Sequence, residues 1–389
     1  MPDRKTLMIP GPSEAHPEVL SVLSKPIMPH YGIDWGRIYE ETCERLKEIF
    51  NTKQSVIILP GPGSAALELA VGNLLEPGDK ALVAYNGWFS EIFRQIIEIY
   101  EAEPILVKVN PGEIVPAEQV REKMEEEEGV RAIFTVQNET ATGVLQPIKE
   151  MGAIAKDFGA LLVVDSVSSF SATEVRADDW NIDICIGYAS KALGAVNGVV
   201  PIMISDRAWE RAEKRREPMR ARFLNLNVWK KFIAEWGSWG HPFPSSMPTT
   251  LVLGLRRAVE LALEEGLENR YRRHRVSGRA MREGVRALEL RVLPDEKVAS
   301  DTVTVATTPE EVNVNRLREI LYDKYDIMIA GALTGVKGIR IGHMGVTASP
   351  MFIIPTLAAL EATLSDLGMK VKAGSGVAAA MNAYRAWGK

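Results

Sequence analysis

Lys191 is the residue whose surroundings most favour chemistry. It follows an apolar run, residues 182–186, and the small residues 187–190, and no acidic residue lies closer in the chain than Asp183. Most other lysines lie among charged residues or in polar turns, where a hydrated ammonium is expected. Burial of a lysine lowers the pKa of its amine, and a neutral amine can attack an aldehyde. Taken alone, the position of Lys191 does not identify a nucleophile.

A second candidate, Asp165, directly follows the apolar run 161–164 and begins the sequence Asp-Ser-Val-Ser-Ser. In α/β proteins, ligands bind at the carboxyl ends of such strands. A buried carboxylate at that place can keep a proton on a ring nitrogen of a ligand, as an electron-withdrawing cofactor requires. The alternative is an aspartate that caps a turn or a helix, which the four preceding apolar residues make less expected.

The loop at residues 59–68, with the sequence LPGPGSAALE, is a candidate phosphate site. A glycine-bearing loop that leaves a strand and opens a helix presents free backbone N–H groups to an anion, and Ser64 adds a hydroxyl. The loop matches neither the GxGxxG pattern of dinucleotide sites nor a nucleotide-binding P-loop, because no Gly-Lys-Ser/Thr follows. On its own such a loop is usually a turn, but its combination with Asp165 and Lys191, in this order, is more specific.

Between Gln54 and Ser205 the chain alternates short apolar runs with amphipathic stretches, as in a mostly parallel sheet with helices between its strands. The runs predicted as strands are residues 55–59, 80–84, 132–136, 161–164, 182–186 and 199–205. The stretches with helical spacing are residues 65–75, 89–100, 117–127 and 148–158. Because runs such as 161–164 are apolar throughout, we expect the sheet to be buried on both faces.

After Pro248 the pattern changes to that of a second, smaller α+β domain. We expect helices at residues 249–265, onward through Arg286, near 355–367 and in the Ala-rich tail, and strands near 301–306 and 338–341. The sequence therefore predicts an N-terminal segment (1–15), a large α/β domain (16–250) and a small C-terminal domain (251–389).

The composition excludes several classes of function. Lys plus Arg number 46 and Asp plus Glu number 51, so the net charge of −5 does not attract polyanions, and no nucleic-acid partner is expected. No apolar run reaches the ~20 residues that a membrane helix needs, and no signal peptide is evident, so a soluble, cytoplasmic protein is expected. Cys43 and Cys185 have no Cys or His partner at metal-ligand spacing, so no metal site is expected. The charge runs at 125–128 and 272–275 are interpreted as solvated helix faces.

The combination of loop, aspartate and lysine resembles the class V, fold type I aminotransferases, and most of all the alanine–glyoxylate, serine–glyoxylate and serine–pyruvate group. The resemblance covers nearly the whole chain. It rests on residues 8–13 (MIPGPS), 61–68, 138–144 (NETATGV), 165–169, 190–191 and 340–345 (RIGHMG). It implies an α/β fold with a mostly parallel seven-stranded sheet in the large domain, a smaller C-terminal α+β domain, and pyridoxal 5'-phosphate as the cofactor.

The resemblance also implies roles for individual residues. Lys191 would be the catalytic residue, which holds the cofactor as a Schiff base and shifts the proton, and Asp165 would pair with the pyridine nitrogen. Gly63 and Ser64 would hold the phosphate. Phe89 matches the aromatic residue that stacks on the cofactor ring, although its neighbour Trp88 is an alternative. The further cofactor contacts implied are Thr140, Val167 and Ser190, and the substrate contacts are Arg340, Gly11 and Thr140.

Arg340 stands alone between Ile339 and Ile341 on an apolar strand, where it needs a partner such as a substrate carboxylate. For Phe89 and Thr140 a purely structural role in the core or in a turn stays open.

Some contacts in this family come from a neighbouring subunit, so the resemblance implies a homodimer with its sites at the interface. Phe243 and Ser246 match the segment that reaches the partner's phosphate. Phe243 stands where a tyrosine is common, and Ser190 replaces a frequent glutamine. These departures put the finer phosphate contacts in doubt while leaving the cofactor assignment in place.

The favoured hypothesis is a ping-pong aminotransferase that moves the amino group of alanine or serine to glyoxylate or pyruvate. Alternatives are a pyridoxamine–pyruvate aminotransferase, a desulfurase, lyase or decarboxylase of the same class, or a binding protein without catalysis. A desulfurase needs a mobile thiol, whereas Cys43 and Cys185 are expected in a helix and a strand. Dicarboxylate substrates stay open, because His30, Tyr31 or a basic group of the partner chain could bind a second carboxylate.

Overall fold

The apolar runs of the first half of the chain form one seven-stranded sheet, in the order β2-β10-β9-β8-β5-β3-β4. The structure is a computed structural model that describes residues 4–333 and 335–387. The strands are β2 (Ser55–Pro60), β3 (Lys80–Tyr85), β4 (Glu103–Lys108), β5 (Val130–Val136), β8 (Leu161–Asp165), β9 (Ile184–Ile186) and β10 (Val199–Ile204). Strand β10 runs antiparallel to both of its neighbours, β2 and β9, and every other pair in this sheet is parallel. The mostly parallel seven-stranded sheet is therefore confirmed.

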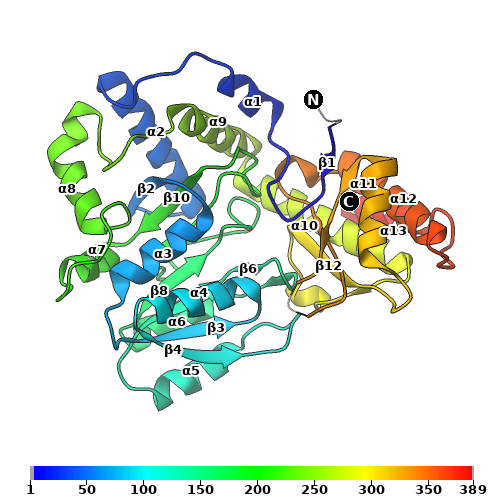
Figure 1. Ribbon diagram of the computed structural model, residues 1–389, viewed down its shortest axis with the longest axis horizontal. Coiled ribbons are helices and arrows are strands. Elements are labelled where there is room, and N and C mark those ends of the chain that lie inside the picture. The colour runs from blue at the N-terminus through cyan, green and yellow to red at the C-terminus, as the bar shows by residue number, and fades with distance from the viewer. Residues whose placement is uncertain (1–3, 334, 388–389) are drawn as a thin grey trace.

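Helices cover both faces of this sheet, and as a consequence every residue of β8 is buried. Helices α3 and α4 pack together, as do α5 and α6, while α2 and α9 meet at the β2 end (Figure 1). The helices of this part are α1 (Pro17–Leu23), α2 (Ile33–Phe50), α3 (Gly63–Leu74), α4 (Trp88–Ile99), α5 (Ala117–Glu126), α6 (Lys149–Asp157), α7 (Asp206–Glu213), α8 (Leu226–Trp236), the 3-10 helix η1 (Gly237–Trp239) and α9 (Thr249–Glu265).

Two elements differ from the sequence prediction for a physical reason. Strand β4 was not predicted, because it is an edge strand that begins Glu-Pro and buries only part of its residues. Helix α12 (Pro350–Asp366) begins earlier than predicted, and the expected start at Pro355 is wrong. Pro350 occupies the first turn, where its missing N–H costs nothing, and Pro355 lies inside the helix.

A second core lies beside the first, on the right of Figure 1, and is built from the end of the chain. Its sheet has the order β11-β12-β15-β14 and is antiparallel throughout. Its elements are α10 (Leu267–Ala287), β11 (Arg291–Val292), the 3-10 helix η2 (Glu296–Val298), β12 (Val303–Thr307), α11 (Val314–Tyr325), β13 (Ile327–Met328), β14 (Ala330–Gly331), β15 (Gly338–Gly342), the 3-10 helix η3 (Gly345–Thr347), α12 and α13 (Ser375–Trp387).

The N-terminal segment belongs to this second core. Strand β1 (Thr6–Leu7) pairs in parallel with β13, and Met8 is fully buried among the apolar side chains of the second core. The amide of Gly342 in β15 donates to the Met8 carbonyl at 2.9 Å. The blue segment in Figure 1 therefore crosses over to the yellow and red half of the molecule.

The boundary between the two parts stays a prediction. Helix α9 lies beyond the expected limit at residue 250, and its buried side chains, such as Leu255 and Val259, pack within the first core. Helix α10 contributes Met281 and Val285 to the second. Within residues 4–333 and 335–387, no helix combines the length and the apolar character that a membrane crossing requires.

Candidate active site

The predicted site residues meet at one edge of the large sheet. Five loops leave the carboxyl ends of its parallel strands there: residues 61–64 after β2, 86–89 after β3, 138–143 after β5, 166–169 after β8 and 187–191 after β9. Strand ends at this edge are where doubly wound α/β proteins bind their ligands. The alternation of strands and helices therefore brings together residues that are far apart in the sequence.

Lys191 lies at the centre of this edge. Its Nζ donates a hydrogen bond to the carbonyl of Pro10 in the N-terminal segment. Burial lowers the pKa of the amine to about 8, Asp165 acts to raise it and Arg340 to lower it further. Gly11 has a φ of +107°, and a Cβ there would overlap the Lys191 side chain. A glycine is therefore required beside the lysine.

Asp165 ends strand β8 and is 4% exposed. Burial raises the pKa of its carboxyl to about 6, although the N–H of Val167, at 2.8 Å from Oδ1, and the positive charge of Lys191 both lower it. The group is thus mostly ionised at neutral pH. Among the described residues, no hydrogen bond reaches its Oδ2.

The loop that carries Lys191 is fixed by the N-terminal segment. Ser13 donates from its amide to the Ser190 carbonyl (2.9 Å) and from its hydroxyl to the Lys191 carbonyl (2.7 Å). The Ser190 hydroxyl donates to Asn197. The sequence analysis assigned no role to Ser13 or Pro10, because their partner lies some 180 residues away.

The expected phosphate loop opens helix α3 as predicted. Gly63 is the first residue of this helix, so its amide and that of Ser64 have no partner within the helix. A Cβ on Gly63 would lie 3.3 Å from Cγ2 of Val167, which places the helix start next to the loop after Asp165. Ser64 is exposed.

Glu139 connects two of the loops, those after β3 and β5, and the sequence analysis gave it no role. The carboxylate is fully buried and accepts from the amides of Phe89 (2.8 Å), Ser90 (3.4 Å) and Ala141 (2.9 Å). Burial raises the pKa of Glu139 to about 7, and these three amides act against the rise. The carboxylate thereby fixes the start of α4, which holds Phe89, against the Thr140 turn. The signal in the sequence was an acidic residue in an otherwise neutral segment after β5.

Arg340 comes from the second core, on strand β15. Its Nε donates to the Gly331 carbonyl at 2.8 Å, and its Nη1 is 3.4 Å from the Thr140 carbonyl. Burial lowers the pKa of the guanidinium, which Glu139 acts to raise. Among the described residues, no hydrogen bond engages Nη2, so one edge of the guanidinium is open.

Phe243 and Ser246 are the predicted residues that the structure does not bring to this group. The Phe243 ring is fully buried and packs against Tyr39 (5.1 Å between ring centroids) and His241 (4.6 Å). Ser246 is exposed. In the described part of the chain, no trio of His, Cys, Asp and Glu side chains is placed to bind a metal ion.

The pKa of Lys191 predicts how its reactivity depends on pH. Because burial holds this pKa at about 8, the neutral fraction of the amine rises about tenfold per pH unit below 8 and levels off above it. Acylation of Lys191 by acetic anhydride, followed by peptide mass spectrometry on protein freed of bound small molecules, should follow that curve. A midpoint near 10.5 would contradict the burial of the amine.

The comparisons with known proteins agree with this geometry. The class V aminotransferase family model matches residues 21–338. The chain is 37% identical to an uncharacterised aminotransferase of Methanocaldococcus jannaschii over 95% of each chain. It is 31% identical to a serine–glyoxylate aminotransferase of Methylorubrum extorquens, over 99% of this chain and 97% of that one.

Among solved structures, the ureidoglycine–glyoxylate aminotransferase of Bacillus subtilis superposes with a TM-score of 0.93 at 30% identity, over 98% of both chains. A family match over most of the chain and this agreement in fold lead to one assignment. The chain belongs to the class V aminotransferase family and is a fold type I transaminase that depends on pyridoxal phosphate.

Proposed function

We propose that the protein transfers the amino group of a small neutral amino acid, such as alanine or serine, to glyoxylate or pyruvate in a ping-pong reaction. The observation that carries this proposal is that Lys191, Asp165 and Arg340 lie close together at one edge of the large sheet. They are near enough that the charge of Asp165 raises the pKa of Lys191 and the charge of Arg340 lowers it. The three groups supply a neutral amine, a buried carboxylate and a guanidinium that can bind a substrate carboxylate through two parallel hydrogen bonds. Relatives named for glyoxylate support the choice of acceptor.

The residues at this edge fit pyridoxal phosphate. The amides of Gly63 and Ser64 at the start of α3, which have no helical partner, would hold its phosphate. The free Oδ2 of Asp165 would accept from the ring nitrogen. Because Gly11 has no side chain, the Lys191 amine has room beside it, where it would face the ring of the cofactor.

The neighbouring side chains would border the ring. Phe89, rather than Trp88, would lie against it, because Phe89 is half-buried and packs on the first core, whereas 45% of Trp88 is exposed. Thr140 and Val167 would touch the cofactor from the loops after β5 and β8. Ser190 would act through its backbone, since its hydroxyl is already bonded to Asn197.

When bound, the cofactor draws electrons from the substrate's α-carbon and so makes the α-hydrogen acidic. Lys191 Nζ would take this proton as a neutral amine and release it again, and a pKa of about 8 suits both directions near neutral pH. Asp165, ionised at that pH, would keep the ring nitrogen protonated.

Arg340 would bind the α-carboxylate of the substrate through its open edge. The second cation near it is Arg318, which acts to lower the pKa of Arg340. The Arg318 guanidinium already donates to the Ile329 carbonyl (3.3 Å) and to the Asn315 side chain (3.5 Å). Both of these partners are neutral, and within the described residues Arg318 forms no ion pair, so the choice of a neutral amino acid as donor rests on the relatives named for serine and alanine.

Replacement of the lysine tests the central claim. The variant Lys191→Ala should lose transaminase turnover by ~10²–10⁴-fold or more, because no other group at the site offers a neutral amine. The matched control Lys53→Ala, at an exposed lysine, should keep the activity. Normal turnover by Lys191→Ala in a coupled assay for the keto-acid product would refute the proposal.

Replacement of Arg340 tests substrate recognition. Loss of its charged hydrogen bonds in Arg340→Ala should lower kcat/KM by about 10–100-fold for every amino acid, and Arg340→Lys should recover only part of it, because a lysine cannot fork. A screen of single donors, read as a fall in the cofactor's visible absorption, should rank alanine and serine above aspartate and glutamate. Preference for pyridoxamine with pyruvate would instead favour the alternative enzyme.

We propose further that two chains form a homodimer and that the exposed Ser246 serves the partner's site, while the buried Phe243 ring supports this segment from within its own chain. Large apolar side chains gather near this segment and are strongly exposed, namely Ile33 (75%), Trp239 (71%) and Tyr31 (61%). The amide of Gly32 donates to the Trp239 carbonyl at 3.1 Å, so the two segments adjoin. Such an exposed cluster is typical of a subunit interface.

A charge within this cluster should separate the subunits. The variant Trp239→Glu should sediment mainly as a monomer in analytical ultracentrifugation, because a carboxylate at the interface would have to be buried without a partner. The matched variant Ile99→Glu, at an equally exposed apolar residue of α4, should stay dimeric. A monomeric wild-type protein would contradict the proposal.

A further inference from the structure

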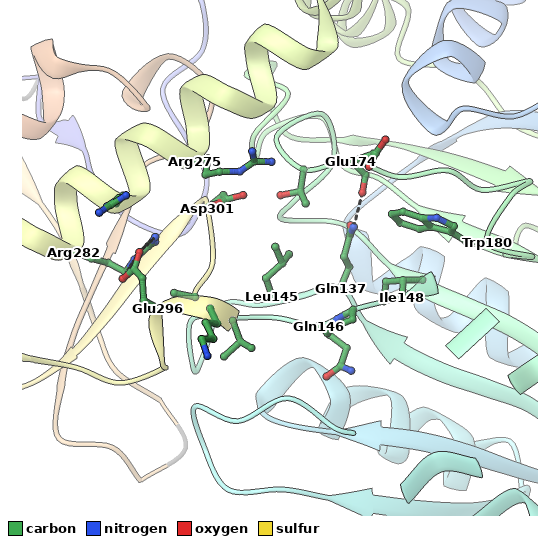
Figure 2. A pocket seen from close by; sticks show the side chains of 16 residues that line it. Gln137, Leu145, Gln146, Ile148, Glu174, Trp180, Arg275, Arg282, Glu296 and Asp301 are labelled. Carbon is green, nitrogen blue, oxygen red and sulfur yellow. Dashed lines mark hydrogen bonds and ion pairs between the residues drawn. The ribbon is translucent and has the colours of Figure 1, made fainter. Parts of the chain in front are cut away.

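A cavity of about 480 Å³ lies between the two cores, away from the site described above. From the large-domain side it is lined by Gln137, directly after β5, and by Trp180, between β8 and β9. From the other side it is lined by Arg275 and Arg279 of α10 and by Lys297 and Asp301 in the segment before β12. Figure 2 shows Arg275 and Asp301 entering the space on one side, and Gln137 and Trp180 facing them from the other. None of the residues proposed for the cofactor or the substrate lines it.

Three of the cationic side chains that line this cavity have no ion-pair partner among the described residues. Arg275 and Arg279 lie one turn apart on α10, and Lys297 belongs to η2; all three side chains are exposed. Within residues 4–333 and 335–387, the charged groups of these three side chains form no ion pair and no hydrogen bond. Arg282, one turn further along α10, differs: it binds Glu296 (2.7 Å) and the Ser300 carbonyl (2.6 Å).

One carboxylate that lines the cavity, that of Asp301, also lacks a hydrogen-bond or ion-pair partner among the described residues. Asp301 is only 7% exposed, and within residues 4–333 and 335–387 its carboxylate has no hydrogen bond or ion pair. Burial raises its pKa to about 6 and Glu296 acts in the same direction, while Arg282 and Arg275 act to lower the pKa, so the carboxylate is the main form at neutral pH. A buried carboxylate normally has hydrogen-bond donors, and here the cavity is the place from which they can come. The other two acids of the wall, Glu174 and Glu296, are paired with arginines.

The remaining wall is partly apolar, although Gln137, Gln146 and Thr173 also belong to it. Ile148 lies on the side of Trp180, and Leu145 contributes a second aliphatic side chain beyond Gln137 (Figure 2). A ligand with a short carbon chain can therefore lie against this wall while its charged ends reach the opposite side.

We propose that this cavity binds an amino acid with a second acidic group, such as glutamate or aspartate, at a site separate from the active site. The ammonium lies against Asp301, and the two carboxylates lie against Arg275, Arg279 and Lys297. A simple dicarboxylate would face the repulsion of Asp301, and a simple amine would face that of the arginines. An anionic amino acid gives each unpaired group a partner of opposite charge. Its position between the cores also means that the ligand contacts both parts of the chain.

Calorimetric titration of the holoenzyme with L-glutamate tests this proposal, with the active site blocked by saturating aminooxyacetate. The wild-type protein should bind glutamate, and the double variant Arg275→Ala/Arg279→Ala should bind it about tenfold or more weakly, since charged hydrogen bonds are lost. The control Arg291→Ala/Arg316→Ala removes the same charge from exposed positions outside the cavity and should bind as the wild type does. Absence of binding, or equal binding by the cavity variant, would overturn the site.

The role of Asp301 has a separate signature. Glutarate, which lacks the ammonium, should bind the wild type about tenfold or more weakly than glutamate does. In Asp301→Asn this preference should shrink, because glutamate loses a partner and glutarate loses a repulsive charge. If glutarate bound the wild type as well as glutamate, the assigned ligand class would be wrong. Should Asp301→Asn fail to fold, the wild-type comparison of the two ligands decides alone.

Discussion

The carboxylate of Asp165 and the amine of Lys191 share one poorly hydrated edge of the large sheet, and each shifts the pKa of the other. Burial of either charge alone would carry a desolvation cost that the hydrogen bonds from Val167 to Asp165 and from Lys191 to Pro10 offset only in part. Their attraction lowers the pKa of Asp165 and raises that of Lys191, whereas burial acts in the opposite direction on both and brings the pKa of the amine to about 8. The loops after five strands meet around this pair, and Ser13 of the N-terminal segment fixes the loop that carries Lys191.

The second core is needed to complete that edge. Arg340 reaches the Thr140 turn from β15, and Pro10 and Ser13 contact Lys191 from a segment whose strand pairs with β13. The large sheet therefore supplies the aspartate and the lysine, while the smaller part supplies the arginine and holds the N-terminal segment against the lysine. A change in the position of the second core relative to the sheet moves these contacts together.

Much of this arrangement could be predicted from local sequence. Apolar runs marked six of the seven strands, and the ends of those runs marked Asp165 and the loop before Lys191, because burial and strand ends are local properties. Helix α9 has the predicted bounds, Thr249–Glu265. The antiparallel direction of β10 could not be inferred, since an apolar run has the same composition in either direction.

Long-range contacts limited the rest. Glu139 binds amides some 50 residues earlier, so its role depends on how α4 meets the loop after β5. Arg275 belongs to a charge run interpreted as a solvated helix face; the side chain is exposed, yet it faces a cavity whose other wall comes from a different core. The sequence pattern describes the helix and not what lies opposite to it.

The N-terminal segment has a consequence for how the chain is made. Residues 6–13 are synthesised well before their partners, because β1 needs β13, the Met8 carbonyl needs Gly342, and Ser13 needs residues 190–191. Domains fold as units during synthesis, so the large sheet can form while the earliest residues still wait for their partners. The lysine is therefore enclosed only after β13 and β15 have been made, so residues 6–13 take their place later than the large sheet does.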